Sequence, residues 1–196
     1  KSKKLNKILQ VGHIERFNPA FVYFTDKKRT PLFIESHRLS PFSNRGHDVP
    51  VILDLMIHDL DIILSIVESN IIDVKANGVS VVSSKIDIAN ARLEFKNGCI
   101  ANLIASRISM KNVRKMRVFE KNNYTNLNMQ DGSIEEYKTY TIKPKIERGD
   151  NIIRLEGEHD KYIRIKKPNI DRYDALKKEL EHFIYCVKNN VKPKTD

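Results

Sequence analysis

Three ionisable residues recur at helical spacing in the middle of the first half of the chain. Asp54, His58 and Asp61 stand at positions i, i+4 and i+7, so a helix places them along one stripe. A carboxylate one turn from a histidine can hold the imidazole in one tautomer and raise its basicity. That arrangement suits a side chain that takes a proton from a reacting group or returns one to it.

The same stripe has two other interpretations. Carboxylates in the first half of a helix interact favourably with the helix dipole, and a neighbouring Asp can satisfy a partly buried His without any catalysis. A metal site built on Asp54 and His58 needs a further ligand such as His13 or His37, and the spacing lacks the His-x-x-x-His and Cys-x-x-Cys forms of zinc sites. Structural, metal-binding and acid–base roles therefore all stay open on the residues alone.

A second polar cluster precedes the stripe. We expect residues 8–17 to form a strand, with Arg16 and Asn18 at its C-terminal end, where they can bind a sugar hydroxyl or a phosphate. The alternatives are an ion pair for Arg16 and, for Asn18, an N-cap on a short helix that begins at Pro19.

Two further arginines, Arg38 and Arg45, flank the Ser-Pro-Phe loop before the stripe. Arginine makes charge-assisted contacts to diphosphates and carboxylates, so both residues are candidates for substrate binding. The alternative for each is an ordinary surface arginine.

The elements that must position these residues are mostly short. Residues 51–67 form the strongest predicted helix, and residues 172–189 a closing helix. The predicted core face of the first helix comprises Leu53, Ile57, Leu60, Leu64 and Val67, and that of the second comprises Leu176, Leu180, Phe183, Ile184 and Val187. Turns are predicted at residues 96–98, 121–123 and 131–132. The expected strands are 32–39, 71–82, 86–95, 99–108, 115–120, 124–129, 139–145 and 162–167.

Tight turns between successive strands favour antiparallel pairing. We therefore expect an α+β fold, an open and mainly antiparallel sheet with helices packed on one face. The chain has 196 residues, of which 40% are apolar, which suits a single domain over residues 1–196.

Charge and cysteine usage narrow the class of protein. The net charge is +10, but the basic residues are scattered, so a solvated surface is the main interpretation, a phosphate-bearing ligand the second and nucleic acid the least favoured. Cys99 and Cys186 lie far apart without ligand spacing, and a reduced, cytoplasmic setting fits best. No apolar run approaches the ~20 residues that span a bilayer, and the basic start leads into no secretory signal.

Two motifs resemble the C-terminal domain of the glucose–fructose oxidoreductase / inositol dehydrogenase / MocA (Gfo/Idh/MocA) family. They are VGHIERFNP at residues 11–19 and DLMIHDLD at residues 54–61, in the family's order. LKKELEHFI at residues 176–184 is similar to the family's late helix, so the likeness covers nearly the whole chain.

The resemblance implies a two-domain oxidoreductase that uses NAD or NADP, bound mainly by a Rossmann-type first domain. It implies that the sheet domain contacts a sugar and forms a homo-oligomer through its exposed sheet face. By motif match, His58 and Asp54 take the catalytic positions, with His58 near the nicotinamide, and Asp61 supports the site. The expected substrate contacts are Arg16, Asn18, Arg38 and Arg45.

Within the family, both motifs are most similar to the subgroup that oxidises UDP-N-acetyl amino sugars at the 3-hydroxyl. Such a substrate carries two phosphates, which matches the basic balance of the chain. The alternative function is a non-catalytic ligand-binding or scaffold domain with the same fold.

The chain departs from the family pattern in its extent. The family's glycine-rich fingerprint and Glu-Lys-Pro motif do not occur in this sequence, which also stops before a further family helix. The resemblance therefore implies a domain truncated at both ends relative to the family. We expect the polypeptide alone to have no dehydrogenase activity, and turnover by it with a nicotinamide cofactor would contradict this expectation.

Overall fold

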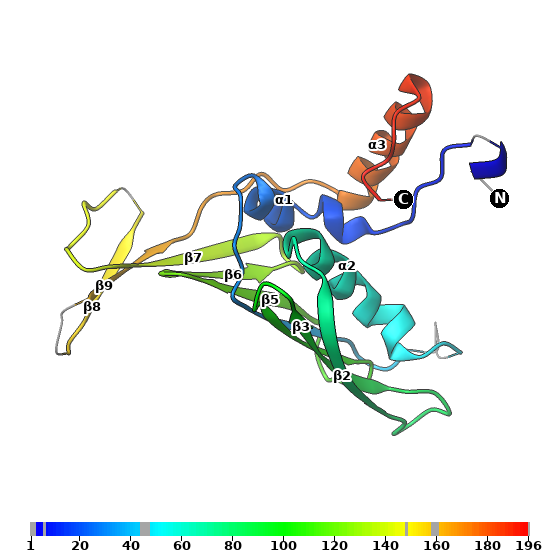
Figure 1. Ribbon diagram of the computed structural model, residues 1–196, viewed down its shortest axis with the longest axis horizontal. Coiled ribbons are helices and arrows are strands. Elements are labelled where there is room, and N and C mark those ends of the chain that lie inside the picture. Colours follow the sequence, from blue (N-terminus) through cyan, green and yellow to red (C-terminus); the bar gives the residue numbers. More distant parts are fainter. Residues whose placement is uncertain (1–2, 6, 44–47, 148, 158–160, 196) are drawn as a thin grey trace.

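The computed structural model describes residues 3–5, 7–43, 48–147, 149–157 and 161–195. Within these ranges nine strands form one sheet in the order β2-β3-β4-β1-β5-β6-β7-β9-β8. Neighbouring strands are antiparallel except β1 and β4, which are parallel. Helices α1 and α2 cover one face of the sheet, the other face is open, and α3 stands away from the sheet beside the N-terminal segment (Figure 1). The expected open, mainly antiparallel sheet is confirmed.

The described elements have these bounds. The helices are η1 (Lys3–Leu5), η2 (Ile14–Phe17), α1 (Pro19–Thr25), the π-helical turn η3 (Ile52–Met56), α2 (Ile57–Ile66) and α3 (Ala175–Asn189). The strands are β1 (Phe33–Leu39), β2 (Ile71–Val79), β3 (Ile88–Phe95), β4 (Ile100–Ser106), β5 (Val113–Glu120), β6 (Asn123–Asn128), β7 (Ser133–Tyr140), β8 (Asn151–Leu155) and β9 (Lys161–Lys166). None of the helices in the described ranges is both long and apolar enough to cross a membrane.

The three predicted turns are confirmed, and each has a residue in the left-handed region. Gly98 (φ 85°) joins β3 to β4, Asn122 (φ 58°) joins β5 to β6, and Gly132 (φ 71°) joins β6 to β7. At Gly132 a Cβ atom would also lie 2.9 Å from the ring of Pro19, so the turn needs glycine for space as well as for backbone angle. The turn thereby packs against the start of α1.

The buried face of the long helix differs from the predicted face. Leu53 and Leu64 are 61% and 51% exposed. The side chains that enter the core are Met56, Asp59, Ile62, Ile63 and Ile66. Both sets recur at three- and four-residue spacing because the helix is apolar nearly all round, so the period cannot distinguish them. The π turn at Ile52–Met56 also rotates the residues before it relative to those after it.

Three other expectations are wrong. Residues 8–17 form no strand, because Val11 pairs only with the chain terminus, through Thr195, and the segment ends in η2. The predicted strand over residues 139–145 is displaced, since β7 ends at Tyr140, and β8 was missed. The spacing on α3 is right, but its apolar face stays exposed, with Leu180 at 54%.

Asp87 holds the loop between β2 and β3 together. Its side chain is buried, and one carboxylate oxygen accepts the backbone N–H groups of Val81, Val82 and Ser83 at 2.8, 2.8 and 2.9 Å. The other oxygen accepts the Ser83 hydroxyl at 2.6 Å. These hydrogen bonds, led by the Ser83 hydroxyl, lower the pKa of Asp87 well below its ordinary value, although burial acts in the opposite direction.

Asp87→Asn should therefore lower stability and change its dependence on pH. A depressed carboxylate pKa stabilises the fold above the unfolded-state value of about 3.9, and this contribution is lost as the pH falls toward the folded-state pKa. Urea unfolding at pH 7 should give a lower midpoint for the variant, and the wild-type advantage should shrink between pH 5 and pH 3, taken as rough bounds of that window. An advantage that stays constant across this range would contradict the role given to the carboxylate.

Candidate functional site

A buried ion cluster joins β1, α2 and η2. Arg38 on β1 donates to Asp59 Oδ1 from Nε at 2.8 Å and from Nη2 at 2.6 Å, and to Glu15 Oε1 from Nη1 at 3.0 Å. Ser36 donates its hydroxyl to the second oxygen of Asp59 at 2.6 Å. Burial alone would lower the pKa of Arg38, but the charges of Asp59 and Glu15 outweigh it and the net shift is upward. The guanidinium is therefore held charged inside the protein.

The substrate contacts expected for Arg38 and Asn18 need correction. Arg38 is 3% exposed, and its donors face Asp59 and Glu15. Asn18 is 7% exposed and caps α1, accepting the Ala20 N–H at 3.1 Å. Its amide donates to Glu15 at 3.1 Å and to the carbonyl of Met129 at 2.8 Å. Both side chains are committed to the interior, so neither is available to a ligand.

Asp59 and Glu15 are the partners that sequence reasoning missed. Asp59 follows His58 directly and shares the buried side of the helix with Met56 and Ile63. An acidic residue on a buried helical stripe is a strong signal of a paired charge, but only once the buried stripe is known. Glu15 carried no such signal, because the segment was expected to be a strand.

His58 lies beside this cluster with an unused ring nitrogen. Its Nδ1 is buried and has no hydrogen-bond partner, and its ring meets that of His13 edge-on, with centroids 6.2 Å apart and planes at 86°. Burial, and next the positive charge of Arg38, lower the pKa of His58 below its ordinary value of 6.5. The imidazole is therefore neutral near pH 7 and able to accept a proton.

Other unpartnered polar atoms lie around the two histidines. Gln10 Oε1, His13 Nδ1 and Glu179 Oε1 are buried without hydrogen-bond partners. Gln10 donates from Nε2 to the backbone carbonyl of Glu179 at 3.4 Å, which brings the N-terminal segment onto α3. Burial raises the pKa of Glu179, opposed by the charge of His13. Buried polar groups are seldom left unpaired, so this group marks a place for a polar ligand or ordered water.

The remaining predicted residues separate into two groups. Arg16 binds Asp61 through Nε at 2.5 Å and Nη2 at 3.0 Å, and His13 Nδ1 lies 3.8 Å from the same carboxylate. Asp54 makes no hydrogen bond to His58 in the described part of the chain. It lies within the π turn, with Oδ2 3.9 Å from Arg107. The predicted orienting contact between Asp54 and His58 is thus not formed, while Asp61 does lie at the site.

Two other expectations end here. Arg45 lies outside the described residues. His37 points to the open face of the sheet, where it lines a shallow pocket with Glu35 and Lys115, so it cannot share a metal with His58. Among the described residues, no group of three or more His, Cys, Asp and Glu is placed to hold a metal ion.

A cleft of about 410 Å³ lies next to the buried cluster. It is lined by Glu15, whose charge also acts on His58, and by Arg114, Arg172 and Tyr173. Arg114 is half exposed, with Nη1 3.6 Å from Glu15 Oε1. Sequence reasoning missed these two arginines, because nothing in their spacing separates them from the other scattered basic residues.

Comparison with known proteins identifies close relatives. The model of the GFO/IDH/MocA C-terminal domain matches residues 4–133. The UDP-N-acetylglucosamine 3-dehydrogenase of Acidithiobacillus ferrooxidans is 34% identical over 182 residues, which are 92% of this chain and 54% of that protein. The chain thus spans about half the length of the curated relative that it matches.

Solved structures agree with this match. A structure of the Acidithiobacillus ferrooxidans enzyme superposes with a TM-score of 0.84 and 31% identity, covering 100% of this chain and 58% of that one. The scyllo-inositol dehydrogenase of Lactobacillus casei, solved with NAD(H) and scyllo-inositol, gives a TM-score of 0.64 at 16% identity over 99% of this chain and 58% of that one. At this identity the second likeness concerns the fold alone.

Arg38→Met should destabilise the fold strongly. The substitution leaves Asp59 and Glu15 buried without their shared cation, and breaking a buried ion pair on one side costs about 3–5 kcal/mol. The matched control is Arg114→Met, which removes the half-exposed arginine beside the same Glu15 and should cost no more than about 1 kcal/mol. Urea denaturation of both variants measures the difference. Similar losses in the two would show that Arg38 is not the centre of the cluster.

Proposed function

Because the chain belongs to the GFO/IDH/MocA family, as its C-terminal domain, we propose that it forms the substrate side of a nicotinamide-dependent dehydrogenase acting on a sugar hydroxyl. The observation that carries this proposal is His58, a neutral imidazole with a buried, unpartnered nitrogen, among other polar atoms that lack partners. Such a group can accept the hydroxyl proton. On this proposal, residues 1–196 act as a single substrate-binding and oligomerisation domain.

The proposed substrate is a UDP-N-acetyl amino sugar oxidised at its 3-position. Support comes from the identity of 34% with the UDP-N-acetylglucosamine 3-dehydrogenase and from the cleft that Arg114 and Arg172 line. Two phosphates in that cleft would receive charge-assisted contacts from both guanidinium groups. Arg16, held in place by Asp61, is the remaining candidate for a contact to the sugar.

The cofactor of the proposed reaction is NAD or NADP. No glycine-rich phosphate loop occurs in this sequence, so the chain is not expected to bind the cofactor's phosphates. What fits a nicotinamide is the group around His58, where a neutral base lies beside unpartnered polar atoms. When bound, the oxidised cofactor accepts a hydride from the sugar carbon.

The chain's own residues handle the proton in this scheme. His58 takes the proton of the hydroxyl group as the carbon is oxidised, so the carbonyl forms without a free alkoxide. Arg38 keeps the imidazole neutral beforehand by lowering its pKa, and Asp61 fixes Arg16 and lies next to His13. Asp54 stays in the proposal as a catalytic-site carboxylate one turn before His58, partnered by Arg107 at 3.9 Å.

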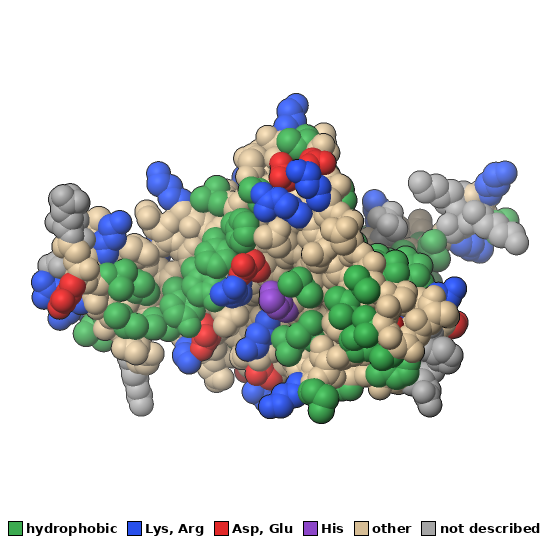
Figure 2. All heavy atoms as spheres, turned by 90° about the horizontal axis from the view of Figure 1, so that it is seen from below, with side chains coloured by type: hydrophobic (Ala, Val, Ile, Leu, Met, Phe, Trp, Pro, Cys, Tyr) green, Lys and Arg blue, Asp and Glu red, His purple; other side chains and the backbone are tan. Residues whose placement is uncertain are grey.

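We also propose that the open sheet face forms a homo-oligomer. Figure 2 shows hydrophobic side chains gathered over this face. An aromatic row crosses four strands, with ring centroids 6.0 Å apart between Phe33 and Phe119 and 4.8 Å apart from Phe119 to Tyr124 and from Tyr124 to Tyr137. Contiguous apolar surface of this kind marks interaction sites.

His58→Ala tests the proposed function in the intact gene product. Loss of the proton acceptor should lower kcat for a UDP-N-acetylhexosamine about 100- to 10,000-fold with a far smaller change in KM. Leu64→Ala, at an exposed position on the same helix, is the control and should keep kcat close to wild type. Nicotinamide reduction followed by absorbance gives both constants. Small, equal changes in kcat and KM would favour a non-catalytic domain.

The pH profile of the wild-type enzyme gives a second test of His58. Since the pKa of His58 is lowered, kcat/KM should stay constant down to pH 6.5 and fall only as the pH drops through the lower pKa. Initial rates from pH 5 to pH 8 measure this. A fall that begins above pH 7 would contradict a base of lowered pKa.

A further inference from the structure

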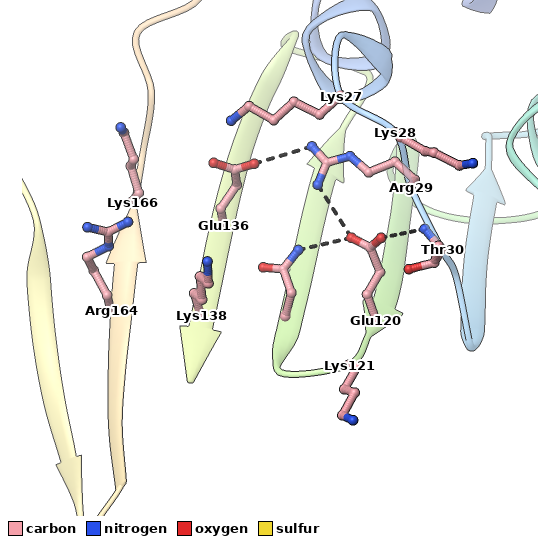
Figure 3. A pocket seen from close by; sticks show the side chains of 11 residues that line it. Lys27, Lys28, Arg29, Thr30, Glu120, Lys121, Glu136, Lys138, Arg164 and Lys166 are labelled. Atoms are coloured by element: carbon pink, nitrogen blue, oxygen red, sulfur yellow. Dashed lines mark hydrogen bonds and ion pairs between the residues drawn. The ribbon is translucent and has the colours of Figure 1, made fainter. Parts of the chain in front are cut away.

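A basic pocket lies on the helix side of the sheet, away from the cleft beside His58. It has a volume of about 370 Å³, and Figure 3 shows its lining residues. The loop after α1, the β5–β6 turn, β7 and β9 contribute its walls, so segments far apart in sequence meet here. The lining residues are Lys27, Lys28, Arg29, Thr30, Glu120, Lys121, Asn123, Glu136, Lys138, Arg164 and Lys166, and none of them lines the cleft beside Glu15.

The two carboxylates of the pocket are already used. Glu120 and Glu136 each lie 3.4 Å from the guanidinium of Arg29, and Glu120 also accepts the Thr30 N–H at 2.7 Å. Arg29 is itself fixed, because it donates to the carbonyl of Phe24 at 2.7 Å and stacks over that ring at 4.1 Å. The side chains of Arg29 and Glu120 are 8% and 9% exposed. The pocket thus has a rigid floor with little charge left to neutralise other cations.

Four cations surround this floor. Lys27 reaches across from the loop toward Glu136, while Lys138 on β7 and Arg164 and Lys166 on β9 form the opposite wall (Figure 3). Lys27 and Lys138 have no ion pair with an acidic side chain among the residues that the structure describes. Arg164 and Lys166 have only distant ones, 3.7 Å to Asp150 and 3.9 Å to Glu147. The wall therefore carries uncompensated positive charge.

The pairing of β7 with β9 makes this charge costly to the fold. Lys138 lies directly opposite Arg164 in the sheet register, with Lys166 opposite the occupied Glu136. Like charges facing each other across two strands destabilise a sheet, whereas an acidic residue at position 138 would form a favourable pair. A concave pocket lined by one sign of charge concentrates counter-ions of the other sign. An anion bound between the strands would remove the repulsion.

We propose that this pocket binds a small soluble anion with two or more adjacent phosphates, of which inorganic pyrophosphate is the simplest representative. Its volume suits a small ligand, and the cations converge from two sides onto one point. Lysine ammonium groups bind phosphate as point charges, and Arg164 can make paired contacts to two oxygens. The site is separate from the proposed active site and does not depend on the proposed function.

Calorimetric titration of pyrophosphate into the intact gene product tests this proposal, with Lys138→Glu as the main variant. Lys138→Glu should weaken pyrophosphate binding about tenfold or more, because it replaces a phosphate contact by a repulsion. Its melting temperature without ligand should equal or exceed that of wild type, because the new carboxylate would face Arg164 across the strand pair. The control for net charge is Lys96→Glu, in the exposed β3–β4 turn, which should bind pyrophosphate like wild type.

Further arms exclude other sources of binding. Wild-type affinity should fall as salt is raised and should be weaker for monophosphate than for pyrophosphate. The proposal is overturned by an absence of binding at low salt, by equal loss in Lys138→Glu and Lys96→Glu, or by loss in Arg114→Ala with none in Lys138→Glu. Tighter binding of a single-stranded oligonucleotide than of pyrophosphate, abolished by Lys138→Glu, would assign the pocket to nucleic acid instead and overturn it too.

Discussion

The site depends on one buried constraint, the contact of Arg38 with Asp59 and Glu15. These charges come from a strand, a helix and the segment before α1, and none can be buried alone without a large desolvation cost. The three elements are therefore held in one arrangement. Because Asp59 is adjacent to His58, the same contact fixes where the imidazole lies. The positive charge of Arg38 then helps to keep that imidazole neutral.

The two faces of the sheet carry different surfaces because strand side chains alternate. On β7 and β9, Lys138 and Arg164 point to the helix side, while Tyr137 and Ile165 point to the open side. Beyond α1 no helix covers these strands, so the first set surrounds the basic pocket (Figure 1). The second set continues the apolar surface of Figure 2. One pair of strands thus contributes to both proposed binding surfaces.

Local features of the fold were predictable from sequence, and partners were not. Asn97-Gly98 and Asp131-Gly132 identify their turns because left-handed backbone angles favour these residues, and Asn18-Pro19 identifies a helix start. The prediction for residues 8–17 failed because the segment finds its hydrogen bonds at the other end of the chain, at Thr195. No local pattern carries that information. The buried helix face failed for a similar reason, since two apolar stripes satisfied the same period.

The sequence by itself determined the family, through two motifs in order, and the residue types near the site, through His58 and its neighbouring carboxylates. Only the tertiary structure decided which of these groups interact. It paired Asp59 rather than Asp54 with a buried cation, and it turned Arg38 and Asn18 inward. It also placed Arg114, Glu179 and His13 around the site. The physical reason is that charge pairing and desolvation depend on distance and burial in space, whereas spacing along the chain reports only which residues share a face.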